Sequence, residues 1–171
     1  MDSAPASAMA LMLLTSLVAA ACALAAGRAV PWQGRQAAVA MPLGMFALLS
    51  PGIPALAVAG VWMLSAMLGT AGLRGRPESA NGCHRALGLL AMVLALVGGG
   101  VVAGPAASHA AHGLAGGLPA LAAVAVLAVV VWSAAGVHHG APERRTRCLL
   151  ITEAWAMSAG LVGMSLLHAV G

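Results

Sequence analysis

Apolar residues in this chain gather into runs of about 20, which short polar segments separate along the whole length. An α-helix needs about 20 apolar residues to cross the hydrocarbon layer of a bilayer, so each run has the length of one transmembrane helix. The pattern therefore predicts an all-α, polytopic membrane bundle of about six helices in a single domain, residues 1–171. The expected helices cover residues 7–26, 36–50, 54–73, 83–103, 118–137 and 148–169.

Composition favours the same class. The chain is 61% hydrophobic and 7% charged, with a mean hydropathy of +0.98. A soluble domain carries about 25% charged residues because its surface faces water. The charges here are too few to coat a surface of this size. The frequent glycines and alanines suit close helix contact in lipid, where small residues let backbones approach one another.

The basic residues give an orientation. All eight are arginines, and they lie in alternate polar segments: Arg28 and Arg35, then Arg74 and Arg76 with Arg85 just beyond, then Arg144, Arg145 and Arg147. Positively charged loops stay cytoplasmic, so we expect both termini outside in a multi-pass protein of the cell membrane. The alternation also indicates that residues 36–73 cross twice, because a single crossing would put Arg35 and Arg74 on opposite sides.

The net charge of +4 does not indicate nucleic-acid binding, because the arginines form no basic domain. Contact with anionic lipid headgroups accounts for them better, so the lipid bilayer is the expected partner. The N-terminal segment, with Asp2 and no basic residue, is unlike the positive start of a secretory signal. We therefore expect the run 7–26 to be kept as the first helix.

Glu153 is the acidic residue that falls inside an expected helix. An ionised carboxylate at that depth costs roughly 2.5–3.5 kcal/mol on insertion scales, so it must be protonated, paired or facing a cavity. Such a residue is a functional candidate. The alternative is structural: Glu153 reaches the cytoplasmic interface or pairs with Arg85 across the bundle.

A stripe of candidate ligands continues from Glu153 along one face of the last helix. Its members are three or four residues apart, the spacing of neighbours on a helix: Glu153, Met157, Gly160, Met164 and His168. The chain has ten methionines, several of them paired in the same way, as in Met9–Met12, Met41–Met45 and Met63–Met67. Thioether sulfur suits Cu(I), with His as a companion ligand. For any one pair, however, packing is the more common role of methionine.

A weak internal repeat points to the same chemistry. Each helix that enters from a basic segment has a triplet at i, i+4 and i+8: Ala37-Met41-Met45, His84-Gly88-Met92 and Glu153-Met157-Leu161. If these helices meet, His84, Glu153 and several methionines share one interior.

The remaining cysteines and histidines fall into two groups, one toward each side of the membrane. Cys83, His84, His138, His139 and Cys148 lie toward the cytoplasmic end, with Cys22 in the inner half of the first helix. His109, His112 and His168 lie toward the outer end. A metal path would need ligands at both mouths, although interfacial histidines are also tolerated without any role. No zinc-finger, zincin or c-type haem attachment spacing occurs in the sequence.

The three segments 37–45, 83–92 and 153–157 resemble those of an uncharacterised family of actinobacterial integral membrane proteins, a domain of unknown function with His/Glu-x-x-x-Met helices. That family favours His at the first position of each segment. This chain has His84 in one of them and Ala37 and Glu153 in the others. The resemblance implies a membrane location and no established activity.

These observations lead to three hypotheses. The first is a membrane protein that binds or passes a soft transition metal, copper, with Glu153, Met157, Met164, His168, His84, Met41, Met45, Met92, His109 and His112 as candidate ligands. The second is a non-catalytic scaffold or accessory subunit that packs against a membrane protein partner or a second copy. The third is a haem-binding electron carrier. None of them requires an enzymatic reaction.

Overall fold

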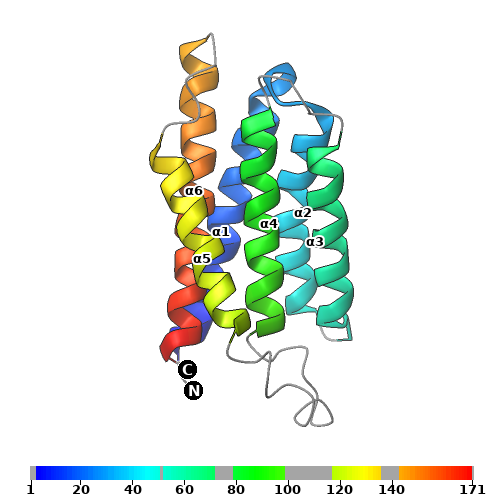
Figure 1. The fold of residues 1–171 in the computed structure, drawn as a ribbon, viewed down its shortest axis with the longest axis vertical. Coiled ribbons are helices and arrows are strands. Elements are labelled where there is room, and N and C mark those ends of the chain that lie inside the picture. Colours follow the sequence, from blue (N-terminus) through cyan, green and yellow to red (C-terminus); the bar gives the residue numbers. More distant parts are fainter. Residues whose placement is uncertain (1–2, 51, 72–78, 99–116, 136–142, 171) are drawn as a thin grey trace.

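Residues 3–50, 52–71, 79–98, 117–135 and 143–170 are described by a computed structural model. Within these ranges the chain forms α1 (Ser3–Ala25), a short 3-10 helix η1 (Gly27–Ala29), α2 (Trp32–Leu49), α3 (Ala55–Thr70), α4 (Ser79–Gly98), α5 (Gly117–Ala134) and α6 (Arg144–Val170). The helices run up and down along one axis, and the start of α1 lies at the same end as the end of α6 (Figure 1). The prediction of an all-α chain with six helices is confirmed.

The helices pack in sequence order around the bundle. Each contacts the next, and α1 closes the ring against α6. The exception is α4, which also contacts α2 and α6 and so lies nearest the centre. Leu89 and Ala91 of α4 are fully buried. The second and sixth helices each contact this central helix, which meets the condition set by the internal repeat for these two pairs.

Four helices begin four residues earlier than the hydropathy pattern predicts. α1 begins at Ser3 rather than 7, α2 at Trp32 rather than 36, α4 at Ser79 rather than 83, and α6 at Arg144 rather than 148. Hydropathy detects the apolar part of a helix, whereas the first turn can carry small or polar residues, including in α2 and α6 arginines whose charged ends reach water. For α2, Pro31 supplies an extended residue directly before the helix, with φ −60° and ψ 156°.

The segment 36–73 forms two helices, as the arginine alternation indicates. The turn between them includes Gly52, whose φ of +95° lies in the left-handed region that favours glycine. Gly27 ends α1 in the same way, with φ +57°. Pro42 lies inside α2 and is buried there. No helix within the described residues combines the length and the apolar character needed to cross a membrane.

A close approach holds α2 against α3. Trp62 of α3 is 1% exposed, and its indole N–H donates to the carbonyl of Ala40 at 2.9 Å. The ring packs directly on Gly44 of α2, where a Cβ would overlap the indole. Glycine is therefore required at this position for steric reasons, although its backbone is helical.

Gly44→Ala should lower the free energy of unfolding by about 1–3 kcal/mol, because an added methyl group displaces Trp62 from a filled interior. Gly60→Ala is the matched control. Gly60 is an exposed helical glycine with no neighbouring atom within 4 Å of an added Cβ. That change should be neutral or stabilise by about 0.5–1 kcal/mol. Unfolding of the purified variants by heat or denaturant measures both, and equal effects would contradict the contact.

Candidate functional site

Two small cavities lie inside the bundle. The first is polar and lined by Asn81, His84, Arg85, Leu150, Glu153 and Ala154. The second is lined by Met12, Thr15, Ser16, Met41, Met92, Met157, Gly160 and Leu161. Each has a volume of about 10 Å³, which is room for about one water molecule or ion. Glu153 and Met157 are one helical turn apart on α6, so the methionine cavity lies one turn farther from the arginine-bearing end.

An ion pair between α4 and α6 forms one wall of the polar cavity. Arg85 Nε donates to Glu153 Oε1 at 2.5 Å, and Nη2 donates to Oε2 at 2.6 Å. The two side chains are 4% and 5% exposed. The parallel bonds engage both carboxylate oxygens, which is the strongest geometry available to such a pair. The structural alternative for Glu153, pairing with Arg85, is confirmed.

Gly34 on α2 makes room for the guanidinium group. A Cβ at this position would lie 2.8 Å from Arg85 Nη1 and 3.1 Å from a methyl group of Val30. α2 can approach the buried arginine this closely because residue 34 has no side chain. Three helices therefore enclose the charge pair, and α2 does so without contributing an acid.

His84 belongs to a hydrogen-bonded chain that joins α4, α5 and α6. Its Nε2 lies 2.9 Å from Ser133 Oγ, which in turn lies 2.9 Å from Ser158 Oγ. Ser133 also donates to the carbonyl of Val129 at 2.9 Å. A hydroxyl group has one hydrogen, so when Ser133 donates to Val129 it accepts from Ser158 and from the Nε2–H tautomer of His84. His84 thus supports the polar layer between the helices.

Asn81 completes the lining of the polar cavity. Its Oδ1 is buried and has no hydrogen-bond partner in the protein. A buried acceptor without a partner costs about 1–3 kcal/mol, and a cavity of this size beside it suits one bound water. This cavity therefore presents an acceptor, an imidazole and an ion pair within one small space.

The methionine cavity brings together thioethers from four helices. Met12 comes from α1, Met41 from α2, Met92 from α4 and Met157 from α6, and all four are buried. Gly88 lets two of them meet, because a Cβ there would touch the terminal methyl groups of Met157 and Met41. The i, i+4, i+8 triplets thus converge as expected at Met41, Met92 and Met157.

The other candidate ligands lie elsewhere. Met45 is buried in the same hydrophobic core but does not line the cavity. Six further candidates lie wholly or partly outside the described residues. Four histidines do so completely: His109, His112, His138 and His139. For two residues of α6 only the side chain is outside: Met164 and His168. Cys83 and Cys148 are exposed, whereas Cys22 is buried.

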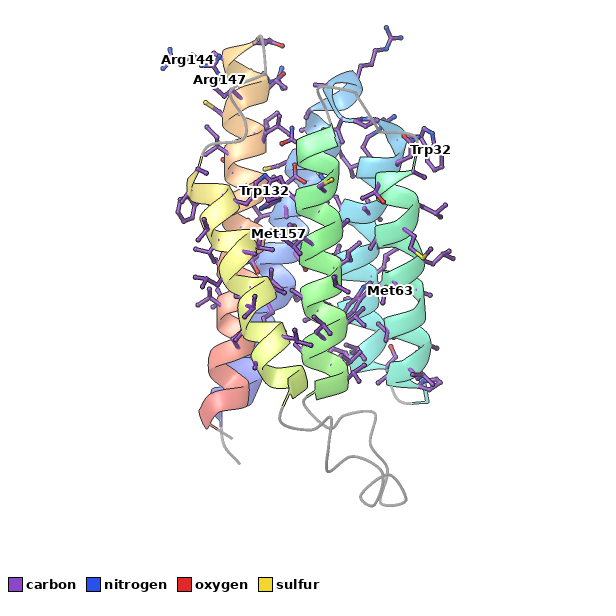
Figure 2. The ribbon with its side chains drawn as sticks, in the orientation of Figure 1. Trp32, Met63, Trp132, Arg144, Arg147 and Met157 are labelled. Carbon is purple, nitrogen blue, oxygen red and sulfur yellow. The ribbon has the colours of Figure 1, made fainter. Side chains whose placement is uncertain are left out.

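The methionine pair of α3 does not share this site. Met63 and Met67 are 41% and 65% exposed, whereas Met157 is 3% exposed. Figure 2 labels Met63 and Met157, which lie on different parts of the bundle. Helical spacing placed each pair on one face but could not show which face is buried. Sequence reasoning named Met12 only as one member of a spaced pair, and it did not single out Asn81 of the polar cavity or the two serines bonded to His84 and to each other, Ser133 and Ser158. A serine within the apolar run of α5 was the available signal for Ser133.

Within the described residues, no three His, Cys, Asp or Glu side chains cluster closely enough to hold a metal ion. The methionine cavity is lined instead by four methionines together with Thr15 and Ser16, whose hydroxyl groups donate to carbonyls of α1. No protein-family model, curated protein or solved structure shows significant similarity to the chain. The residues themselves are therefore the basis for a functional assignment.

Removing one partner of the ion pair should be costly. Arg85→Met or Glu153→Leu should each lower the free energy of unfolding by about 3–5 kcal/mol, because the remaining charge stays buried without a partner. The double variant should lose much less than the sum of the two. Arg144→Met, at an exposed position, should change stability by less than about 0.5 kcal/mol. Denaturant unfolding of the four proteins gives the comparison, and additive losses at residues 85 and 153 would contradict the pairing.

Proposed function

We propose that this chain is an integral membrane protein that binds or passes a soft transition metal, copper as Cu(I), at the methionine cavity. The observation that carries the proposal is the convergence of Met12, Met41, Met92 and Met157 from four helices on one small buried space. Thioethers are soft, neutral donors of the kind that selects Cu(I) over harder ions.

The membrane part of the proposal is supported by the side surface of the bundle. Large exposed apolar side chains occur on five helices, among them Leu14, Leu43, Leu64, Leu127 and Trp155. Single exposed leucines are ordinary in soluble proteins, but this many large exposed apolar side chains, on five helices of one small bundle, are not. The support is this surface together with the sequence pattern, since no described helix is by itself both long and apolar enough to cross a bilayer.

The positions of the charged residues also support the membrane part of the proposal. In the described residues the exposed charged side chains are Arg28, Glu143, Arg144, Arg145 and Arg147, and they lie at helix ends. Figure 2 shows Arg144, Arg147 and Trp32 at one end of the bundle. The charges of Arg85 and Glu153 are buried and paired. A bundle with an apolar side and an arginine-bearing end fits a bilayer with that end cytoplasmic.

The position of the polar cavity fits a route by which a metal would reach the methionines. It lies between the arginine-bearing end and the methionine cavity, and Asn81 Oδ1 and His84 face it. Arg85 engages both carboxylate oxygens of Glu153, so Glu153 is not one of the proposed metal ligands. Its role in the proposal is to balance the buried charge of Arg85. The thioethers alone form the proposed binding site.

A second function, a non-catalytic membrane scaffold, is favoured by a different property of the same residues. The four methionines belong to the main hydrophobic core, where Met is a common filler of irregular gaps. In a scaffold the apolar side surface would contact a membrane protein partner or a second copy, and the core would hold no metal.

Met157→Leu should weaken Cu(I) binding at least tenfold, because leucine keeps the volume and removes the sulfur donor. A tenfold change corresponds to about 1.4 kcal/mol. Met63→Leu is the matched control, since Met63 is 41% exposed on α3 and away from the cavity. Competition of each detergent-purified protein with a chromophoric Cu(I) chelator measures the affinity. Equal affinities for all three proteins, or no competition by the unaltered chain, would favour the scaffold.

The orientation can be tested with the native thiols. Cys83 and Cys148 are exposed near the starts of α4 and α6, at the arginine-bearing end, whereas Cys22 is buried. A membrane-impermeant maleimide should label the first two in inverted vesicles and not in intact cells. Labelling in intact cells would reverse the orientation. Recovery of the protein in the supernatant after the membranes are removed would refute the membrane assignment.

A further inference from the structure

A surface groove between α2 and α3 has a volume of about 480 Å³, far larger than either of the two interior cavities. Its lining is apolar except at one end: Gln36, Val39, Ala40, Leu43, Gly44, Ala47, Ile53, Ala57, Val58 and Val61. Small residues on both helices create the hollow. Trp62 lies behind Gly44 and Ala40, with its indole bonded to the Ala40 carbonyl, so the inner side of the groove is filled.

A hydrogen bond between the two helices marks the polar end of the groove. Gln36 Nε2 donates to the carbonyl of Ser65 at 3.3 Å and so ties α2 to α3. Beyond this bond the same face of α2 carries Trp32 and Arg35, each four residues before a lining residue. Trp32 is 61% exposed and Arg28 is also exposed in η1. Residues 28–36 contain two arginines and no acid.

The length of the groove fits one acyl chain. The lining on α2 runs from Gln36 to Ala47, a length of about 16 Å at 1.5 Å per residue. That is about half of the roughly 30 Å hydrocarbon core of a bilayer, the depth that the acyl chains of one leaflet span.

We propose that this groove is a binding site for an anionic phospholipid, with one acyl chain between α2 and α3 and the headgroup at Arg28, Arg35 and Trp32. Tryptophan and arginine are the side chains that meet lipid headgroups at a membrane interface. The position of Trp32 at the arginine-bearing end of the bundle agrees with this assignment (Figure 2). The inference rests on the membrane part of the proposed function and does not depend on the metal.

Native mass spectrometry of the full chain tests the site directly. The protein in detergent is mixed with equal amounts of phosphatidylglycerol and phosphatidylcholine, and the retained lipids are counted. The unaltered chain should retain phosphatidylglycerol at least threefold more than phosphatidylcholine. Ala57→Phe fills the groove and should reduce retention of both at least fivefold. Ala123→Phe, at an exposed alanine of α5, is the matched control and should leave retention unchanged.

Arg35→Gln separates the headgroup from the acyl chain. It should remove the preference for phosphatidylglycerol and leave retention of phosphatidylcholine unchanged, whereas Arg144→Gln should alter neither. Equal retention of both lipids by the unaltered chain, or equal loss in the two phenylalanine variants, would overturn the site. Conversion of a dimer to a monomer by Ala57→Phe, without loss of lipid, would assign the groove to a second copy and also overturn it.

A measurement on a chain with an unaltered groove tests the site even if the groove variants do not fold. In a chain carrying Trp132→Phe and Trp155→Phe, the remaining tryptophans are Trp32 at the mouth of the groove and Trp62 behind it. Phosphatidylglycerol with brominated acyl chains should quench their fluorescence at lower mole fractions than brominated phosphatidylcholine. Identical quenching curves would contradict the site. A chain found outside the membrane fraction would instead refute the membrane assignment, so the two failures are distinguishable.

Discussion

The buried pair of Arg85 and Glu153 fixes the register of the central helix against α6, and the rest of the interior follows from it. Its two bonds set both the height and the rotation of the helices. One turn farther along, Gly88 of α4 then lies opposite Met157 of α6. A buried ion pair adds little net stability over a well-packed apolar pair but is costly to break. Its value here lies in specifying one arrangement, and the methionine cavity depends on that arrangement.

The bundle has its polarity inside. The described residues place an ion pair, a histidine and several serines within the helices, while large apolar side chains cover the sides. Several interior polar groups find partners on another helix, as in the chain from His84 through Ser133 to Ser158. Glycines at residues 34, 44 and 88 let helices approach where an arginine, a tryptophan and a methionine fill the space. Small side chains likewise leave the groove between α2 and α3 open to a lipid.

Much of this fold could be predicted from the sequence, because helix-length apolar runs and alternating arginines are local signals. The count of helices and the division of residues 36–73 followed from them. Four helix starts were misplaced, at Ser3, Trp32, Ser79 and Arg144, since hydropathy does not register a first turn of small or polar residues. The candidate site was predicted in part. Spacing brought Met41, Met92 and Met157 together, but it could not show that Met63 and Met67 face outward or that Met12 joins the cavity. Those facts depend on helix rotation, which only packing determines.

The central claim is that the four thioethers form a metal site and are more than core packing. X-ray absorption at the copper edge, on detergent-purified protein loaded with one equivalent of Cu(I), tests it most directly. We predict a first coordination shell dominated by sulfur in the unaltered chain and in Met63→Leu, with sulfur lost from that shell in Met157→Leu. A shell of nitrogen or oxygen alone, or a sulfur shell unchanged by Met157→Leu, would contradict the account.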